Sequence, residues 1–156
     1  MSPIDQQLHD LGIVLPAAAA PIANYVPYVL SGNLLVISGQ LALGPNGVAR
    51  EHKGKIGGTV TPEQGIAAAR LCAINVLAQA KAALGDLGRI SRCIRLGGFI
   101  NASPEFATLP AIMNGASDLM VAVLGDKGRH ARTTVGVAQL PLDCAVEVEA
   151  MFEVAP

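Results

Sequence analysis

Residues 61–100 read TPEQGIAAARLCAINVLAQAKAALGDLGRISRCIRLGGFI, a helix pattern followed directly by a strand pattern. The helix begins after Thr61, whose side chain can accept an early backbone N–H, with Pro62 at the first helical position and Gln64 completing a capping box. Gly85 is typical of a helix end. The apolar residues between these signals fall on one arc at helical spacing: Ile66, Ala69, Ala73, Val76, Leu77, Ala80 and Leu84. The polar residues fall on the other half: Glu63, Gln64, Arg70, Asn75, Gln79 and Lys81. The pattern predicts an amphipathic helix whose alanines allow close approach to a sheet.

Strand patterns and a second helix surround this segment. A second helix is expected from Pro110 to Gly125, and Asn46-Gly47 is typical of the tight turn of a hairpin. Five runs rich in Val and Ile are predicted strands: Tyr25–Leu30, Leu34–Ser38, Ile90–Ile100, Arg132–Ala138 and Ala145–Val154. This order predicts an α+β fold, a two-layer sandwich in which both helices cover one face of a mixed β-sheet. The 156 residues are too few for a second core, so we expect a single domain over residues 1–156.

The last two predicted strands carry the charged residues that are candidates for a functional site. In the final strand Val146, Val148 and their alternate neighbours form one face, while Glu147 and Glu149 lie on the other. The strand before it places Arg132 on one face together with Thr134 and Gly136. We therefore expect a cation and carboxylates close together on neighbouring strands.

Composition limits the classes of protein and partner. With 51% hydrophobic and 15% charged residues, the chain is expected to fold and to bury some apolar surface, on the uncovered face of the sheet, against other copies. Prolines and glycines interrupt the uncharged stretch 11–49, so we expect no membrane-spanning helix there. The start, 1–10, has two acids and no basic run, which favours a cytoplasmic protein. A net charge of -1 and 3% aromatic residues make nucleic acid an unexpected partner.

No metal site or redox motif is indicated. Cys72, Cys93 and Cys144 form no C-x-x-C pair and have no histidine at ligand spacing, so we expect buried free thiols. The three histidines, His9, His52 and His130, lie far apart in the sequence. A histidine can serve as a catalytic base here only if the fold brings them together. The loop 50–55, with four basic side chains beside glycines, fits either an anion site or a solvated flexible loop, and we favour the solvated loop.

Arg132 is the strongest candidate for binding chemistry. It opens a strand of small and apolar residues, where an always-charged guanidinium needs a partner. Its planar fork suits a substrate carboxylate held by two hydrogen bonds. The residues alone leave an alternative equally open, namely a structural ion pair with Glu147 or Glu149.

Two stretches resemble a known family. The segment GNLLVISGQL at 32–41 and the segment ARTTVGVAQLPLDCAVEVE at 131–149 are similar to the RidA/YjgF family of reactive-intermediate deaminases. Its members also carry the labels translation-initiation inhibitor and perchloric-acid-soluble ribonuclease. The resemblance implies a chorismate mutase-like fold and a homotrimer with three clefts between subunits.

The family's site residues carry over to this sequence by position. The resemblance implies that Arg132 and the backbone N–H of Gly39 hold a small carboxylate metabolite, that Glu147 orients water, and that Tyr25 closes the pocket. The implied reaction converts enamines or imines such as 2-aminoacrylate to 2-oxo acids and ammonia. It needs no metal and no organic cofactor.

The sequence also departs from the family pattern near Arg132. Thr134 replaces a usual cysteine and is expected to bind through its backbone N–H, and Pro110 occupies the position of a usual asparagine. Asn114 and Ser117, in a segment NGASDL typical of a longer branch, are expected to face the cleft and alter specificity. The alternatives to a deaminase are a non-catalytic module that binds small carboxylates and, against the charge and aromatic content, a ribonuclease or translation inhibitor.

Overall fold

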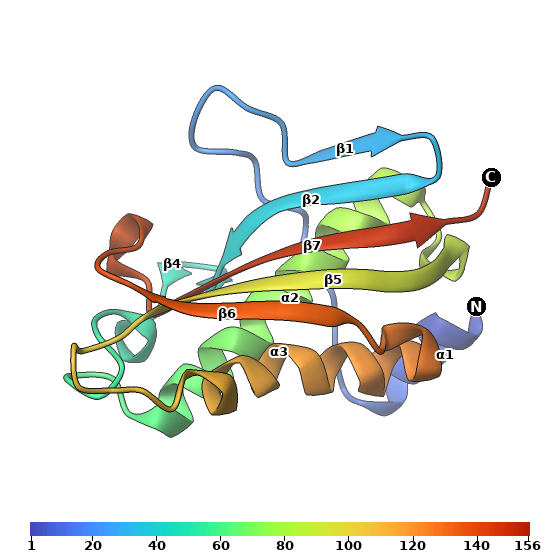
Figure 1. Ribbon diagram of the computed structural model, residues 1–156. Helices are drawn as coiled ribbons and strands as arrows, with labels where there is room; N and C mark the ends of the chain where they lie inside the picture. The colour runs from blue at the N-terminus through green and yellow to red at the C-terminus, as the bar shows by residue number, and fades with distance from the viewer.

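One five-stranded sheet and three α-helices make up the chain, which a computed structural model describes from Met1 to Pro156 (Figure 1). The sheet has the order β1-β2-β7-β5-β6, and β3 and β4 form a separate hairpin. The helices are α1 (Pro3–Asp10), α2 (Pro62–Leu84) and α3 (Leu109–Leu124). The strands are β1 (Tyr28–Ser31), β2 (Leu34–Leu41), β3 (Leu43–Gly44), β4 (Gly47–Val48), β5 (Ile90–Asn101), β6 (Ala131–Val137) and β7 (Val146–Val154).

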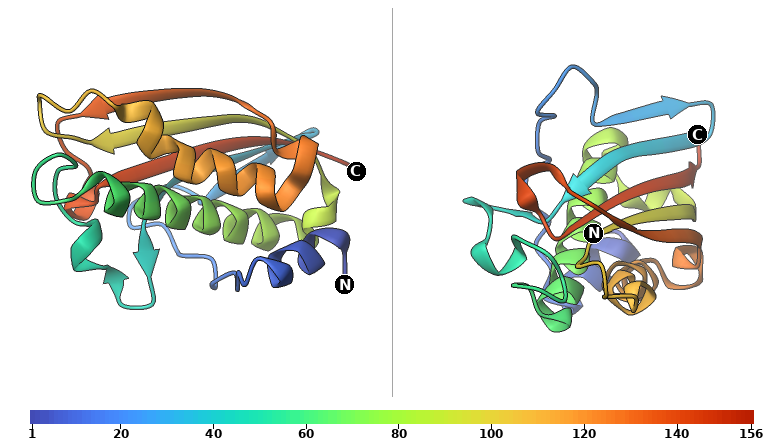
Figure 2. Two further views of the ribbon diagram at one scale, coloured as in Figure 1. Left: turned by 90° about the horizontal axis from the view of Figure 1, so that it is seen from below. Right: turned by 60° about the vertical axis from the view of Figure 1, so that its left-hand side comes forward.

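The sheet is mixed and is covered by helices on one face. β1, β2, β7 and β5 pair antiparallel in that order, whereas β6 pairs parallel with β5. Because parallel neighbours need a crossover, α3 carries the chain from β5 to β6. α2 and α3 lie side by side beneath the same face, as the left view of Figure 2 shows. The predicted two-layer α+β fold is confirmed.

The predicted start and end signals of α2 are also found. Thr61 Oγ1 accepts the Gln64 N–H at 3.1 Å, Gln64 Oε1 accepts the Thr61 N–H at 3.0 Å, and Gly85 ends the helix with φ 75°. The predicted division into arcs is wrong in part, because Ile66 is 38% exposed while Asn75 and Gln79 are buried. These two amides satisfy backbone carbonyls of neighbouring segments, which allows polar side chains inside the core.

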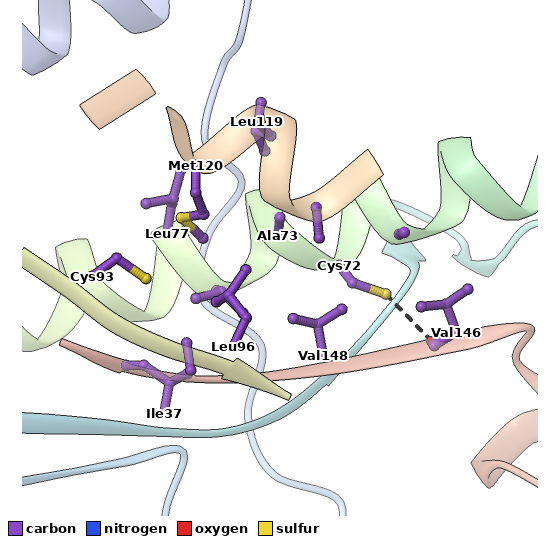
Figure 3. Packing of buried hydrophobic residues seen from close by; sticks show 14 of the residues in the cluster. Ile37, Cys72, Ala73, Leu77, Cys93, Leu96, Leu119, Met120, Val146 and Val148 are labelled. Carbon is purple, nitrogen blue, oxygen red and sulfur yellow. Dashed lines mark hydrogen bonds between the residues drawn. The ribbon is translucent and has the colours of Figure 1, made fainter. Parts of the chain in front are cut away.

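Small residues let the helical layer approach the sheet closely. Leu77 of α2 and Met120 of α3 point toward Leu96 and Val148 of the sheet, and Ala73 lies between the two helices (Figure 3). A Cβ at Gly115 would lie 3.0 Å from the Ile66 carbonyl carbon, so α3 crosses α2 there with no room for a side chain. α2 is long and apolar enough to cross a bilayer by length and composition, yet 56% of its most apolar window is buried in this fold.

Three departures from the predicted helices and strands exceed one residue. The first strand begins at Tyr28 rather than Tyr25, because the chain up to Pro27 is a loop, which ends where the Pro27 carbonyl accepts the Ser38 N–H of β2 at 2.9 Å. β2 continues to Leu41, beyond the predicted end at Ser38. α1 was not predicted, although Ser2 and Asp5 form a reciprocal capping box at its start. The predicted hairpin is found between β3 and β4, but its two turn residues are Pro45 and Asn46, and Gly47 begins β4.

Candidate functional site

Three of the predicted site residues line one cavity. Tyr25 from the loop before β1, Gly39 from β2 and Glu147 from β7 meet there, and we call them the Glu147 half-site. The cavity measures about 60 Å³, small against the roughly 300–1,000 Å³ of typical ligand sites. Its remaining lining is mostly apolar and consists of Ala19, Ala20, Pro21, Ile22, Pro27, Gln40, Leu41, Leu43 and Pro141. The single chain therefore supplies an apolar pocket with a carboxyl group in its wall, but the pocket has little room for a ligand.

A bulge in β2 brings the backbone of Gly39 against Glu147. The pairing of β2 with β7 shifts register between Ile37 and Gln40, and Gly39 falls in this interruption. A Cβ at Gly39 would lie 2.9 Å from Glu147 Cδ and 3.2 Å from its Cγ, so only glycine permits this approach. Ser38, the other bulged residue, donates from Oγ to Val26 O at 2.7 Å and holds the loop that carries Tyr25.

Glu147 is partly removed from water. It projects from the sheet face that no helix covers, and burial in the cavity, followed by the nearby Glu149 carboxylate, raises its pKa. A carboxyl group whose pKa is raised toward neutrality is better suited to pass a proton to and from a reacting water. Glu149 has its own partner, since Arg95 Nη1 lies 3.3 Å from its Oε1.

The other predicted residues gather at the opposite edge of the sheet. Arg132 of β6 donates from Nη1 to Asn114 Oδ1 at 2.8 Å and to Ser117 Oγ at 3.1 Å, and from Nη2 to Pro110 O at 3.1 Å. Asn114, Ser117 and Pro110 all belong to α3. Thr134 lies on the same face of β6, and its Oγ1 is buried without a hydrogen-bond partner. Arg132, Thr134, Asn114 and Ser117 form what we call the Arg132 half-site.

Arg132 keeps hydrogen-bonding capacity for a ligand. A guanidinium has five N–H groups, and Asn114, Ser117 and Pro110 take three of them. The two that remain are the Nε–H and one N–H of Nη2, which share one edge of the guanidinium and can engage a carboxylate together. Arg132 forms no ion pair within the chain, so the predicted alternative of a structural pair with Glu147 or Glu149 is wrong.

The prediction that Arg132 and the carboxylates lie close on neighbouring strands is also wrong. β5 separates β6 from β7 in the sheet. Arg132 stands beside the buried Leu96 on the helix-covered face, whereas Glu147 stands beside Phe99 on the uncovered face. The strand order puts them two strands apart, and the alternation of side chains puts them on opposite faces. A single chain thus holds two half-sites that do not meet.

The remaining candidates have structural surroundings. All three cysteines are free and buried as predicted, and burial raises the pKa of Cys93 to about 12 and that of Cys72 well above its usual value. Lys55 of the basic loop donates from Nζ to Asn101 Oδ1 at 2.7 Å, so the ammonium group of this lysine is held by the fold and is not part of a free, flexible loop. No group of three His, Cys, Asp or Glu side chains is arranged to hold a metal ion.

His130 was not predicted to belong with Arg132, but it does. Its Nε2 lies 2.8 Å from Ser117 Oγ and its Nδ1 lies 2.6 Å from Gly128 O. The sequence offered one signal for it, its position two residues before Arg132. At that spacing a strand would place both side chains on one face.

Comparison with known proteins gives one consistent relationship. The family model described as "YjgF/chorismate mutase-like, putative endoribonuclease" matches residues 5–154. Protein TCP17 of Trypanosoma cruzi is 52% identical over 147 residues, which are 94% of this chain and 91% of that protein. A protein of unknown function from Agrobacterium tumefaciens is 47% identical, with a TM-score of 0.90 over 97% of this chain and 92% of that one. Escherichia coli TdcF, solved with bound serine, is 25% identical, with a TM-score of 0.64 over 88% of this chain and 94% of that one.

Proposed function

Because this chain belongs to the YjgF/chorismate mutase-like family, we propose that it hydrolyses small 2-imino acids to 2-oxo acids and ammonia. The reaction takes place in a cleft that two protomers of a homotrimer share. One protomer contributes the Arg132 half-site and its neighbour contributes the Glu147 half-site.

The observation that carries this proposal is the complementarity of the two separated half-sites. The Arg132 half-site has two unused N–H donors and no carboxylate partner. The Glu147 half-site has a carboxyl group with a raised pKa, an apolar wall and too little volume to enclose a substrate. In a ring of three copies, one surface of each protomer contacts a different surface of the next. The Arg132 half-site and the Glu147 half-site can therefore meet at each of the three interfaces.

The uncovered face of the sheet supports assembly. Val29, Val36 and Val135 lie on it and are 50%, 38% and 41% exposed. Val29 and Val36 are paired across β1 and β2 and so form one apolar patch, whereas Val135 lies on the opposite edge strand, β6. A contiguous exposed apolar patch of this kind is typical of a protein–protein contact. TdcF, crystallised with serine, supports a ligand that carries a carboxylate and an amino nitrogen on the same carbon.

The proposed reaction needs two things from the protein: a fixed position for the substrate and one group that transfers protons. The free edge of Arg132 holds the substrate carboxylate, and the apolar wall of the neighbouring half-site excludes excess water. Glu147 takes a proton from a bound water as the water oxygen bonds to the C=N carbon, and returns this proton to the imine nitrogen. The resulting carbinolamine then passes its hydroxyl proton through Glu147 to the amino nitrogen as the C–N bond breaks, so that R–C(=NH)–COO⁻ and H₂O become R–CO–COO⁻ and NH₃.

Mixing two inactive variants tests the shared cleft. Arg132→Ala and Glu147→Gln should each lack activity, measured as ammonia release from 2-aminoacrylate that a PLP-dependent dehydratase generates in the cuvette. Co-refolded at equal amounts, they should recover about one quarter of wild-type activity, since that share of clefts combines an intact Arg132 with an intact Glu147. Each variant refolded alone is the control. No recovery in verified mixed trimers would contradict the shared cleft.

A binding module without turnover is the second candidate, and the serine bound to TdcF favours it. In that case calorimetry detects pyruvate or serine binding that Arg132→Ala abolishes, while none of several imino acids is hydrolysed faster than in buffer. The name of the family also contains an endoribonuclease, so the same preparations are incubated with RNA. RNA cleavage that Arg132→Ala abolishes would replace both candidates.

A further inference from the structure

A row of hydrogen bonds leads from Arg132 back to the turn that precedes β6. Arg132 Nη1 lies 3.1 Å from Ser117 Oγ, Ser117 Oγ lies 2.8 Å from His130 Nε2, and His130 Nδ1 lies 2.6 Å from Gly128 O. The row joins β6, α3 and the 3-10 turn η3 (Gly125–Gly128). Nothing in the proposed reaction uses His130 or this turn.

For the neutral imidazole form of His130, the chemistry of the groups at the two ends fixes the direction of every bond in the row. A carbonyl oxygen only accepts, so His130 Nδ1 carries a proton and donates it to Gly128 O. In the neutral imidazole Nε2 is then an acceptor, and the Ser117 hydroxyl must donate to it. The lone pairs of Ser117 Oγ are left for Arg132 Nη1, which can only donate. All the donors therefore point from Arg132 toward Gly128.

The far end of the row is rigidly anchored. Gly128 is buried, and a Cβ there would lie 2.6 Å from the Met120 carbonyl carbon and 2.9 Å from Val121 N. The turn is therefore packed directly on the backbone of α3. Because α3 also carries Ser117 and Asn114, one helix fixes both the anchor of His130 and the acceptors of Arg132.

We propose that His130 is a positioning residue for Arg132 and acts through Ser117. The imidazole accepts the Ser117 hydroxyl hydrogen, so this hydrogen points away from the guanidinium. The Ser117 oxygen then remains an acceptor for Arg132 Nη1. This keeps the free edge of Arg132, Nε–H and Nη2–H, in one orientation. Without the imidazole the hydroxyl can rotate, and serines in helices often donate to the carbonyl four residues earlier, here Met113. The inference rests on the proposed function, because it assigns His130 to the carboxylate clamp of that site.

Two substitutions at position 130 separate the two ring nitrogens. His130→Asn keeps a donor near the Nδ1 position for Gly128 O but cannot reach Ser117, whereas His130→Gln keeps an acceptor near the Nε2 position. We expect His130→Asn to weaken pyruvate binding, measured by calorimetry, by about 2- to 10-fold, and His130→Gln to restore most of it. Melting temperatures of both variants control for stability. Equal losses in the two variants would overturn the proposal.

A double-mutant cycle tests whether His130 acts through Ser117. Ser117→Ala alone should weaken pyruvate binding, and adding His130→Asn to it should change the affinity no further. Independent, additive losses would show that His130 acts by another route, and the proposal would be wrong.

A readout that needs no ligand keeps this inference separate from the proposed function. ¹⁵N NMR should find the His130 proton on Nδ1 and separate Nη1 and Nη2 signals for Arg132, which merge in His130→Asn as the guanidinium rotates more freely. If the wild type binds no carboxylate yet shows these signals, the proposed function fails and the positioning role stands. A proton on Nε2, or Arg132 signals that His130→Asn leaves unchanged, would overturn the positioning role.

Discussion

Gly39→Ala should displace the Glu147 carboxyl group, the proton carrier of the proposed reaction, and leave the fold intact. An alanine Cβ would lie 2.9 Å from Glu147 Cδ and 3.2 Å from Cγ, with Oε1 closer still, whereas ordinary contacts begin at 3.4 Å. The carboxyl group must therefore move by about 0.5–1 Å. Misplacement by about 1 Å can lower kcat/KM about 100-fold, which corresponds to about 2.7 kcal/mol of activation free energy.

The free energy of unfolding should hardly change in the same variant. The obstruction is the far end of a half-buried side chain, and alanine restricts the unfolded chain, which stabilises the fold by about 0.4–1 kcal/mol. We therefore expect a change of less than about 1 kcal/mol in urea unfolding, measured beside ammonia release from 2-aminoacrylate. Gly44→Ala is the matched control, because its Cβ would meet only the Gly47 carbonyl oxygen, at 3.6 Å. A Gly39→Ala variant within about twofold of the wild type in kcat/KM would refute the reasoning.

Three further predictions concern charge, buried hydrogen bonds and capping. The raised pKa of Glu147 means that the folded state holds this proton more tightly, so its contribution to stability is complete below about pH 4.5 and is lost as the pH rises through the folded pKa. Glu147→Gln should remove that loss in urea unfolding followed from about pH 4 to about pH 8; an unchanged slope would contradict it. Asn75→Ala leaves the carbonyls of Leu41 and Leu43 without their donor and should lower the free energy of unfolding by about 1–3 kcal/mol in the same assay. Thr61→Ala removes the cap of α2 and should cost about 1 kcal/mol, seen as a lower Tm, whereas an unchanged Tm would show that the capping bond is unimportant.

Much of the fold could be predicted because its signals are local. The capping box at Thr61, the glycine at position 85 and the apolar repeat between them define α2 without reference to the rest of the chain. The alternation in β7 likewise identifies its buried face. The polar residues of α2 were misplaced because the partners of Asn75 and Gln79 lie in segments 32 to 60 residues away.

Most residues of the candidate site could be predicted from the sequence, but their arrangement in space could not. The family resemblance selected Tyr25, Gly39 and Glu147, and these three line one cavity. It also led to Asn114 and Ser117, which contact Arg132. Local patterns do not state which strands are neighbours, so the sequence could not show that β5 separates the two half-sites. The presence of His130 in the row could not be predicted either, because it depends on the packing of η3 on α3.

The sequence by itself determined the two long helices, the five strands of the main sheet, the apolar side of the last strand, and the family that the chain resembles. These properties depend on residues a few positions apart, where propensity, capping and periodicity act. Only the tertiary structure decided that Arg132 and Glu147 leave the sheet from opposite faces and are separated by a strand. Strand order is set by the packing of the whole chain around one core, and it is this order that turns a single predicted site into two halves in each protomer.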